Sequence, residues 1–105
     1  MHITPNEYGE IVTKVYDTTY KAAFKPVRIE GQGKNTDKIR LFIRGCKEDS
    51  THEVWTQWYE YQLNSQLEIV NEPHIFEDYH LFQFKIAVND SDAEISVKSF
   101  VFEVV

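Results

Sequence analysis

The alternation of apolar and polar residues predicts β-strands along most of the chain. Apolar residues take the even positions in 81–88 and the odd positions in 39–44, as on one buried face of a strand. Two more strands are expected at roughly 10–16 and 20–29. Because Pro26 has no backbone N–H to donate, the strand at 20–29 is expected to be an edge strand or to be interrupted at that residue.

The last two strands are expected to form an antiparallel hairpin, with 81–88 paired to 95–104 across a polar turn at 89–94. In the second of these strands, the apolar set changes parity between Val97 and Phe100. A β-bulge near Lys98 and Ser99 would return the strand to its original face. The core is expected to contain Phe82, Phe84, Ile86, Phe100 and Phe102.

Turn-forming residues recur every ten to fifteen positions, at 17–19, 30–35, 47–50, 64–65, 71–73 and 89–92. Short apolar runs separated at this spacing are typical of all-β proteins. The sequence therefore predicts one β-rich domain over 1–105, an antiparallel sandwich or partly open barrel of about six to eight strands. An α+β fold is the alternative.

Residues 50–63 fit two patterns. Ser50 and Glu53 have the spacing of a helix capping box, which makes one short helix in 50–63 an alternative. The Trp, Tyr and Thr content is more typical of a strand, which we favour. In a single continuous strand, Trp55 and Trp58 would face opposite sides of the sheet.

Composition predicts a soluble cytoplasmic protein. The 105 residues include one cysteine, so no disulfide can form within the chain. The N-terminus lacks the basic start and apolar run of a signal peptide, and no apolar stretch approaches membrane-spanning length. We therefore expect no membrane partner.

The charges are segregated along the chain, although the net charge is only −6. Residues 21–47 contain eight cations and two carboxylates, whereas the stretch between Lys47 and Lys85 contains eight carboxylates and no cation. Such segregation creates either two electrical faces or two halves that neutralise each other.

The acidic stretch, together with an exposed Trp, is the predicted partner-binding surface. Acidic groups beside exposed aromatic rings are typical of a protein-binding site, because Trp and Tyr bury a large area at small entropic cost. The predicted partner is a protein with a basic surface. The partner-binding residues are Glu53, Trp58, Glu60, Glu68, Glu72, Glu77 and Asp78.

Two other groups of residues resemble binding sites in part. Arg40, Phe42 and Arg44 share one strand face, as in a single-stranded nucleic-acid platform, but the net charge of −6 disfavours a polyanion. His74 and His80 lie near carboxylates, but their spacing matches no zinc signature. The sequence thus predicts no cofactor, no metal and no nucleic-acid partner.

Three hypotheses for function follow. The first is a small binding protein without catalytic activity, of inhibitor, immunity or adaptor type. The second is a β-module that stacks a sugar or another small molecule on Trp and Tyr. The third is a small metal-dependent hydrolase around His74, Glu77 and His80. The sequence leaves the oligomeric state open, including a homo-oligomer.

Overall fold

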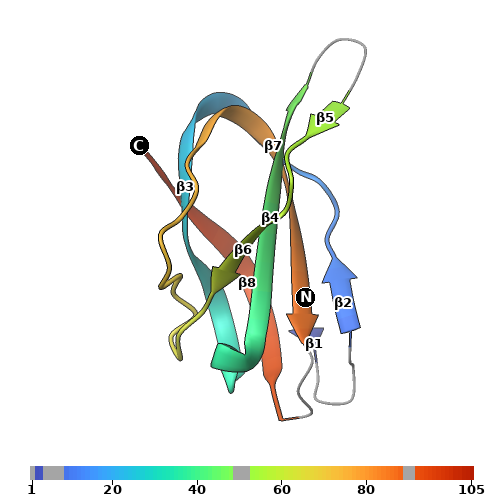
Figure 1. Cartoon of the computed structure of the whole chain (residues 1–105), viewed down its shortest axis with the longest axis vertical. Coiled ribbons are helices and arrows are strands. Elements are labelled where there is room, and N and C mark those ends of the chain that lie inside the picture. Colours follow the sequence, from blue (N-terminus) through green and yellow to red (C-terminus); the bar gives the residue numbers. More distant parts are fainter. Residues whose placement is uncertain (1, 4–8, 49–52, 89–91) are drawn as a thin grey trace.

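The computed structural model describes residues 2–3, 9–48, 53–88 and 92–105 and contains eight strands and one short 3-10 turn (Figure 1). This result confirms the all-β prediction and the expected number of strands. The elements are β1 (His2–Ile3), β2 (Gly9–Val12), β3 (Tyr16–Lys34), η1 (Thr36–Lys38), β4 (Ile39–Glu48), β5 (Glu53–Trp55), β6 (Tyr59–Gln62), β7 (Phe76–Val88) and β8 (Glu94–Val104).

The strands form one antiparallel sheet that is not closed into a barrel. β7 lies at its centre. β4 pairs with β7 on one side, and β3 and β2 pair with different parts of β7 on the other side. β4 also pairs with β6 and β5, and β8 joins β3 to β1.

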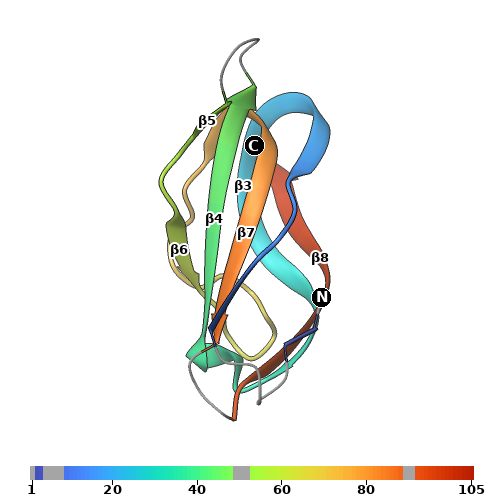
Figure 2. The same ribbon diagram turned by 90° about the vertical axis from the view of Figure 1, so that its right-hand side faces the viewer.

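β3 belongs to both halves of the sheet. Its first part, from Tyr16 to Phe24, pairs with β7, and its second part, from Phe24 to Lys34, pairs with β8. The sheet thereby folds over itself into two layers, with β4 and β7 on one side and β8 on the other (Figure 2). The core lies between these layers.

The expected hairpin of 81–88 with 95–104 is wrong. β7 and β8 are not hydrogen-bonded to each other, because β3 lies between them in the sheet. Instead, Phe84 of β7 stacks on Phe100 of β8, with ring centroids 3.7 Å apart. Alternation had shown which face of each strand is apolar, and two apolar faces can meet across a core as well as along one sheet. Residues 89–91 of the expected turn lie outside the described residues.

The expected bulge in β8 is confirmed. Glu30 pairs with Ser99 and Gly31 pairs with Val97, so Lys98 is the extra residue. Ile95 and Val97 are buried before the bulge, and Phe100 packs against the core after it. The bulge therefore keeps both apolar sets on the same side of the strand.

The turn expected at 30–35 is strand as far as Lys34, and the glycines there have a different role. A Cβ atom at Gly31 would clash with the carbonyl oxygen of Ser96 in β8. Glycine within a strand often marks such a close backbone approach. The chain turns only at Asn35, whose φ of 52° lies in the left-handed region, and then enters η1.

The residues expected to form a turn at 17–19 make a hydrogen bond typical of a turn, but they lie within β3. The Asp17 carboxylate accepts a hydrogen bond from the backbone N–H of Thr19 (2.8 Å), and Thr19 has a φ of 69°. Residues 18–21 bulge out of the ladder between the pairs Asp17–Leu81 and Ala22–Tyr79. A local turn can therefore be absorbed by a strand as an irregularity.

Pro26 interrupts a ladder, but β3 is not an edge strand. Its partner in β8 is Phe102, and the register shifts before the next pair, Arg28 with Val101. Beyond Phe24, the other side of β3 faces the 63–75 loop, where Val27 and Ile29 exchange backbone hydrogen bonds with residues 67 and 69.

The segment 53–63 forms two short strands separated by residues 56–58, and none of its described residues is helical. Residues 49–52, including Ser50 and His52, lie outside the described residues. The buried core comes from alternate positions of β4 and β7, from β3 and β8, and from the segment after β5. It includes Phe24, Ile29, Ile39, Leu41, Ile43, Tyr61, Leu63, Leu67, Phe76, Phe82, Phe84, Ile86, Val88, Ile95 and Val97.

Candidate functional site

The outer face of the layer that contains β4 and β7 carries the candidate site. On β4, the buried residues alternate with Arg40, Phe42 and Arg44, whose side chains therefore point away from the core. Phe42 lies opposite Lys85 of β7 on one side and Glu60 of β6 on the other. Three strands thus bring cations, a ring and a carboxylate onto one surface.

These side chains form a continuous series, which we call the cation–aromatic ladder. Its members are Glu60, Arg40, Phe42, Lys85, Trp58, Arg44 and Trp55. Lys85 Nζ lies 4.5 Å from the ring centre of Phe42 and 4.7 Å from that of Trp58. A cation over an aromatic face is attracted by the ring quadrupole, by about 0.5–1 kcal/mol at exposed sites.

Arg44 is the most constrained member of the ladder. Its guanidinium carbon lies 4.5 Å from the ring of Trp58 and 4.6 Å from that of Trp55. Its Nε donates to Oε1 of Gln83 (3.0 Å), and the Gln83 amide in turn donates to the carbonyl oxygen of Thr13 (2.9 Å). The guanidinium is therefore held in one orientation, which lowers the entropy lost when a partner binds.

Arg40 and Glu60 close the ladder at its other end. Arg40 Nε donates to Oε1 of Glu60, and the two side chains are 53% and 45% exposed. This hydrogen bond lowers the pKa of the Glu60 carboxyl. The pair shows that the basic and acidic segments of the sequence meet within one molecule.

Trp55 and Trp58 do not lie on opposite faces, where a single continuous strand would have placed them. Both indoles contact the same guanidinium, that of Arg44, so they lie on the same side of the sheet. Strict alternation fails here because residues 56–58 are not strand, which resets the parity between β5 and β6. Both tryptophans are half-buried.

Of the predicted partner-binding residues, the structure brings Trp58 and Glu60 together in the ladder. Glu68 lies in a tight turn, where its carboxylate accepts a hydrogen bond from the Asn64 amide (2.9 Å). Glu72 is exposed in the loop that follows, and Glu77 and Asp78 are exposed at the start of β7. The side chain of Glu53 lies outside the described residues.

Sequence reasoning missed Lys85 as a member of the site. Lys85 sits at an odd position of β7, so alternation does place it on the outer face. Its neighbours there come from β4 and from the segment before β6, and only the strand pairing reveals them.

The two histidines of the hydrolase hypothesis have separate surroundings. The His74 ring stacks on Tyr59 with centroids 4.0 Å apart, and burial lowers the pKa of His74. His80 Nδ1 lies 3.2 Å from the carboxylate of Asp17 on β3. Within the described residues, no three His, Cys, Asp or Glu side chains gather closely enough to hold a metal ion.

Comparisons of the chain with protein-family models, with curated proteins and with solved structures found no match. In the parts of the chain that the structure describes, no helix is long and apolar enough to cross a membrane. The fold and the site define an all-β protein with an open antiparallel sheet and a cation–aromatic ladder on its outer face.

Proposed function

We propose that this protein is a binding module without catalytic activity that recognises another protein through the cation–aromatic ladder. The observation that carries the proposal is the position of Arg44 over both indole rings. Trp and Arg are enriched among the residues that dominate binding energy at protein interfaces. Here they are half-buried and already ordered, as anchors at the centre of an interface are.

Charge decides which partner the ladder fits. The ladder contains three cations, Arg40, Arg44 and Lys85, and one carboxylate, that of Glu60. An acidic protein segment is complementary to this excess, since opposite potentials favour encounter and register. The charge of the proposed partner is therefore opposite to that of the basic protein predicted from the sequence. Along the sequence the acidic stretch stands apart from the cations, whereas the fold places cations of β4 and β7 beside it.

The cations also argue for a protein partner over a nucleic acid or a sugar. Bases and sugar rings bind by stacking on open aromatic faces. In the ladder, cations lie over the rings of Phe42, Trp55 and Trp58, so a stacking ligand would have to displace them. The net charge of −6 also opposes a long polyanion more strongly than a short acidic segment.

A displayed library of random peptides tests both the surface and the sign of the partner. Selection on the unmodified protein is expected to enrich peptides rich in Asp and Glu. Trp58→Ala should weaken the best peptide at least about tenfold, the loss expected for a central aromatic anchor. Val54→Ala is the matched control, because Val54 is an apolar side chain 65% exposed on β5 that is not part of the ladder.

Two outcomes would contradict the proposal. Enrichment of peptides rich in Lys and Arg, whose binding is weakened by Glu60→Gln, would restore the basic partner. Enriched peptides that bind Trp58→Ala and Arg44→Gln as well as the unmodified protein would place the binding surface elsewhere.

A further inference from the structure

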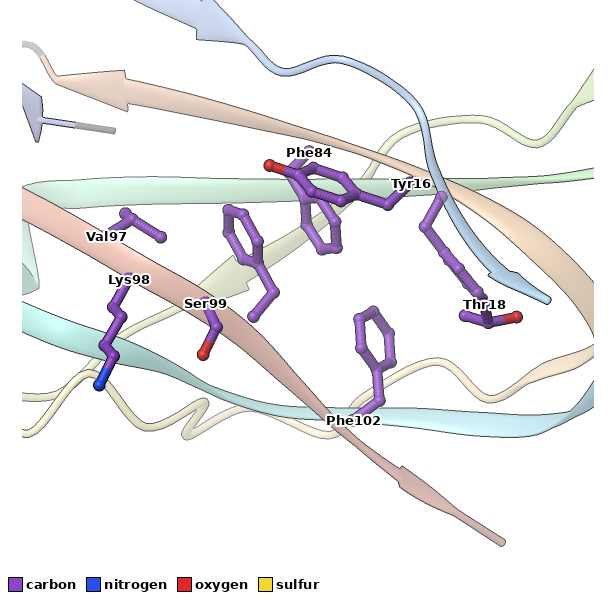
Figure 3. A pocket seen from close by; sticks show the side chains of 9 residues that line it. Tyr16, Thr18, Phe84, Val97, Lys98, Ser99 and Phe102 are labelled. Carbon is purple, nitrogen blue, oxygen red and sulfur yellow. The ribbon is translucent and has the colours of Figure 1, made fainter. Parts of the chain in front are cut away.

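A pocket of about 280 Å³ opens between the two layers (Figure 3). It lies on the opposite side of β7 from the ladder, because its walls include the inward-facing Phe82 and Phe84. It is lined by Phe82 and Phe84 of β7, by residues 97–100 and Phe102 of β8, and by Tyr16 and Thr18 of β3. The opening exists because the first residues of β3 pair with β7, whereas β8 pairs only with the second part of β3. No strand of the described sheet joins the layers at this point.

The walls of the pocket are aromatic and closely packed against one another. Phe84 stacks on Phe100 at 3.7 Å, and the Tyr16 ring meets both edge-on at 5.6 and 6.2 Å. Phe102 lies 5.9 Å from Phe84. In Figure 3 the rings of Tyr16, Phe84 and Phe102 border a common space. The hollow is therefore bounded by ordered rings that contact one another.

Aromatic surface remains uncovered at this pocket. Tyr16 is 39% exposed, and Phe100 and Phe102 are only half-buried, although Phe82 and Phe84 beside them are almost fully buried. Removing apolar area from water is favourable, roughly in proportion to the area removed. A molecule seated among these rings would gain this free energy without rearranging the core.

Two cations lie near the rim of the pocket, and each has a contact of its own. Lys14 Nζ lies 5.5 Å from the centre of the Tyr16 ring. Lys98, the charged residue of the lining, lies with its Nζ 3.9 Å from the Glu30 carboxylate. The Ser99 hydroxyl also donates to that carboxylate (3.4 Å). The walls themselves are aromatic, so a charged ligand would lose more hydration on entering the pocket than an uncharged one.

From this geometry we infer that the protein binds a small, uncharged, planar apolar molecule in the pocket. A closed apolar cavity of about 150 Å³ holds one benzene molecule. The volume of about 280 Å³ fits a molecule of two fused rings. This site is separate from the ladder, and its inference does not depend on the proposed protein partner.

Indole, an uncharged bicyclic molecule, is the probe, and indole-3-acetate is its anionic counterpart. Amide shifts in a nuclear magnetic resonance titration should saturate with indole and be largest in residues 97–102 and 16–18. Indole-3-acetate should bind more weakly. Tyr16→Ala should weaken indole about three- to tenfold through the lost ring contact, whereas Val54→Ala should leave its affinity unchanged.

Thr18→Phe is a second variant, which places a ring at the pocket mouth and should abolish the indole shifts while the circular dichroism spectrum stays unchanged. Shifts that do not saturate, or that concentrate around Trp58, would overturn the inference. Equal binding of indole to the unmodified protein and to Thr18→Phe would also overturn it. A dimer that forms with increasing protein concentration in sedimentation, and whose formation shifts the same amide signals, would also overturn the inference. A second copy of the chain would then cover the rings.

Discussion

The two sides of β7 carry aromatic clusters of opposite character. On the inner side, Phe84 contacts other rings, those of Tyr16, Phe100 and Phe102. On the outer side, Lys85 lies over Phe42 and Trp58. Consecutive residues of one strand thus belong to a ring–ring cluster and to a ring–cation cluster.

The difference teaches how water decides what an aromatic ring contacts. Between the layers a cation would lose its hydration, so the rings there pack mainly on one another. On the outer face the ammonium and guanidinium groups stay partly hydrated while they lie over the rings. We therefore expect the inner cluster to dominate stability and the outer cluster to dominate recognition.

The largest effect is expected from Phe84→Ala. Phe84 is 2% exposed, and its loss removes the ring stack and leaves a cavity, which should lower the free energy of unfolding by about 3–5 kcal/mol. The half-buried Phe42 is the outer counterpart, and Phe42→Ala should cost below about 2 kcal/mol. Urea titrations of both variants measure the difference. Equal losses would show that the two clusters do not divide stability in this way.

The stability of the protein at high pH tests the burial of Tyr61 in the core. Burial raises the pKa of Tyr61 to about 12, so its hydroxyl stays protonated in the folded protein after it ionises in the unfolded chain. The unfolded state then binds fewer protons, and stability should fall between about pH 10 and 12, by at most about 2–3 kcal/mol. Tyr61→Phe should lack this part of the decline in denaturant titrations across that range. An identical decline in both proteins would contradict the assignment.

Arg44→Lys tests how much the planar guanidinium contributes to the cluster on the outer face. The substitution keeps the charge but removes the planar group that lies over two indoles and bonds to Gln83. Stability should fall by about 1 kcal/mol, and binding of an acidic peptide should weaken more than the loss of stability explains. Lys98→Gln removes a positive charge at a side chain 80% exposed on the other layer, and it shows how much binding changes through net charge alone.

The smallest effect on stability is expected from reversing two acidic residues together, Glu60→Lys with Glu77→Lys. Arg40 and Glu60 are both about half exposed, and such surface pairs contribute about 0.2–1 kcal/mol, less in high salt. Association with an acidic peptide should become faster, because the ladder gains positive charge. Slower association with a basic protein would instead support the partner predicted from the sequence.

Alternation along the chain was sufficient to predict the faces of the strands. It placed Phe82, Phe84 and Ile86 in the core, and the change of parity in β8 located the bulge at Lys98. It also placed Arg40, Phe42 and Arg44 on one face. These predictions succeed because the side-chain period of a strand is a local property.

Strand partners and irregular segments could not be predicted in the same way. The pairing of β7 with β3 and β4 depends on contacts between distant residues, so the hairpin with β8 was wrong. Gly31 suggested a turn because glycine serves both turns and close backbone approaches, and only the nearby Ser96 carbonyl distinguishes them. The three residues between β5 and β6 likewise turned Trp58 towards Arg44 and Lys85.

The sharing of β3 between two layers has a consequence for the order of folding. Its first part needs β7 and its second part needs β8, and the Phe84 amide donates to the Thr13 hydroxyl across 71 residues of sequence. Pairing over such distances requires large loops to close before any contact forms, which places β-rich chains of this kind among the slower folders, in milliseconds to seconds. On the ribosome, the first part of β3 must therefore wait for its ladder until β7 has emerged, and the second layer can form only after β8 has followed it.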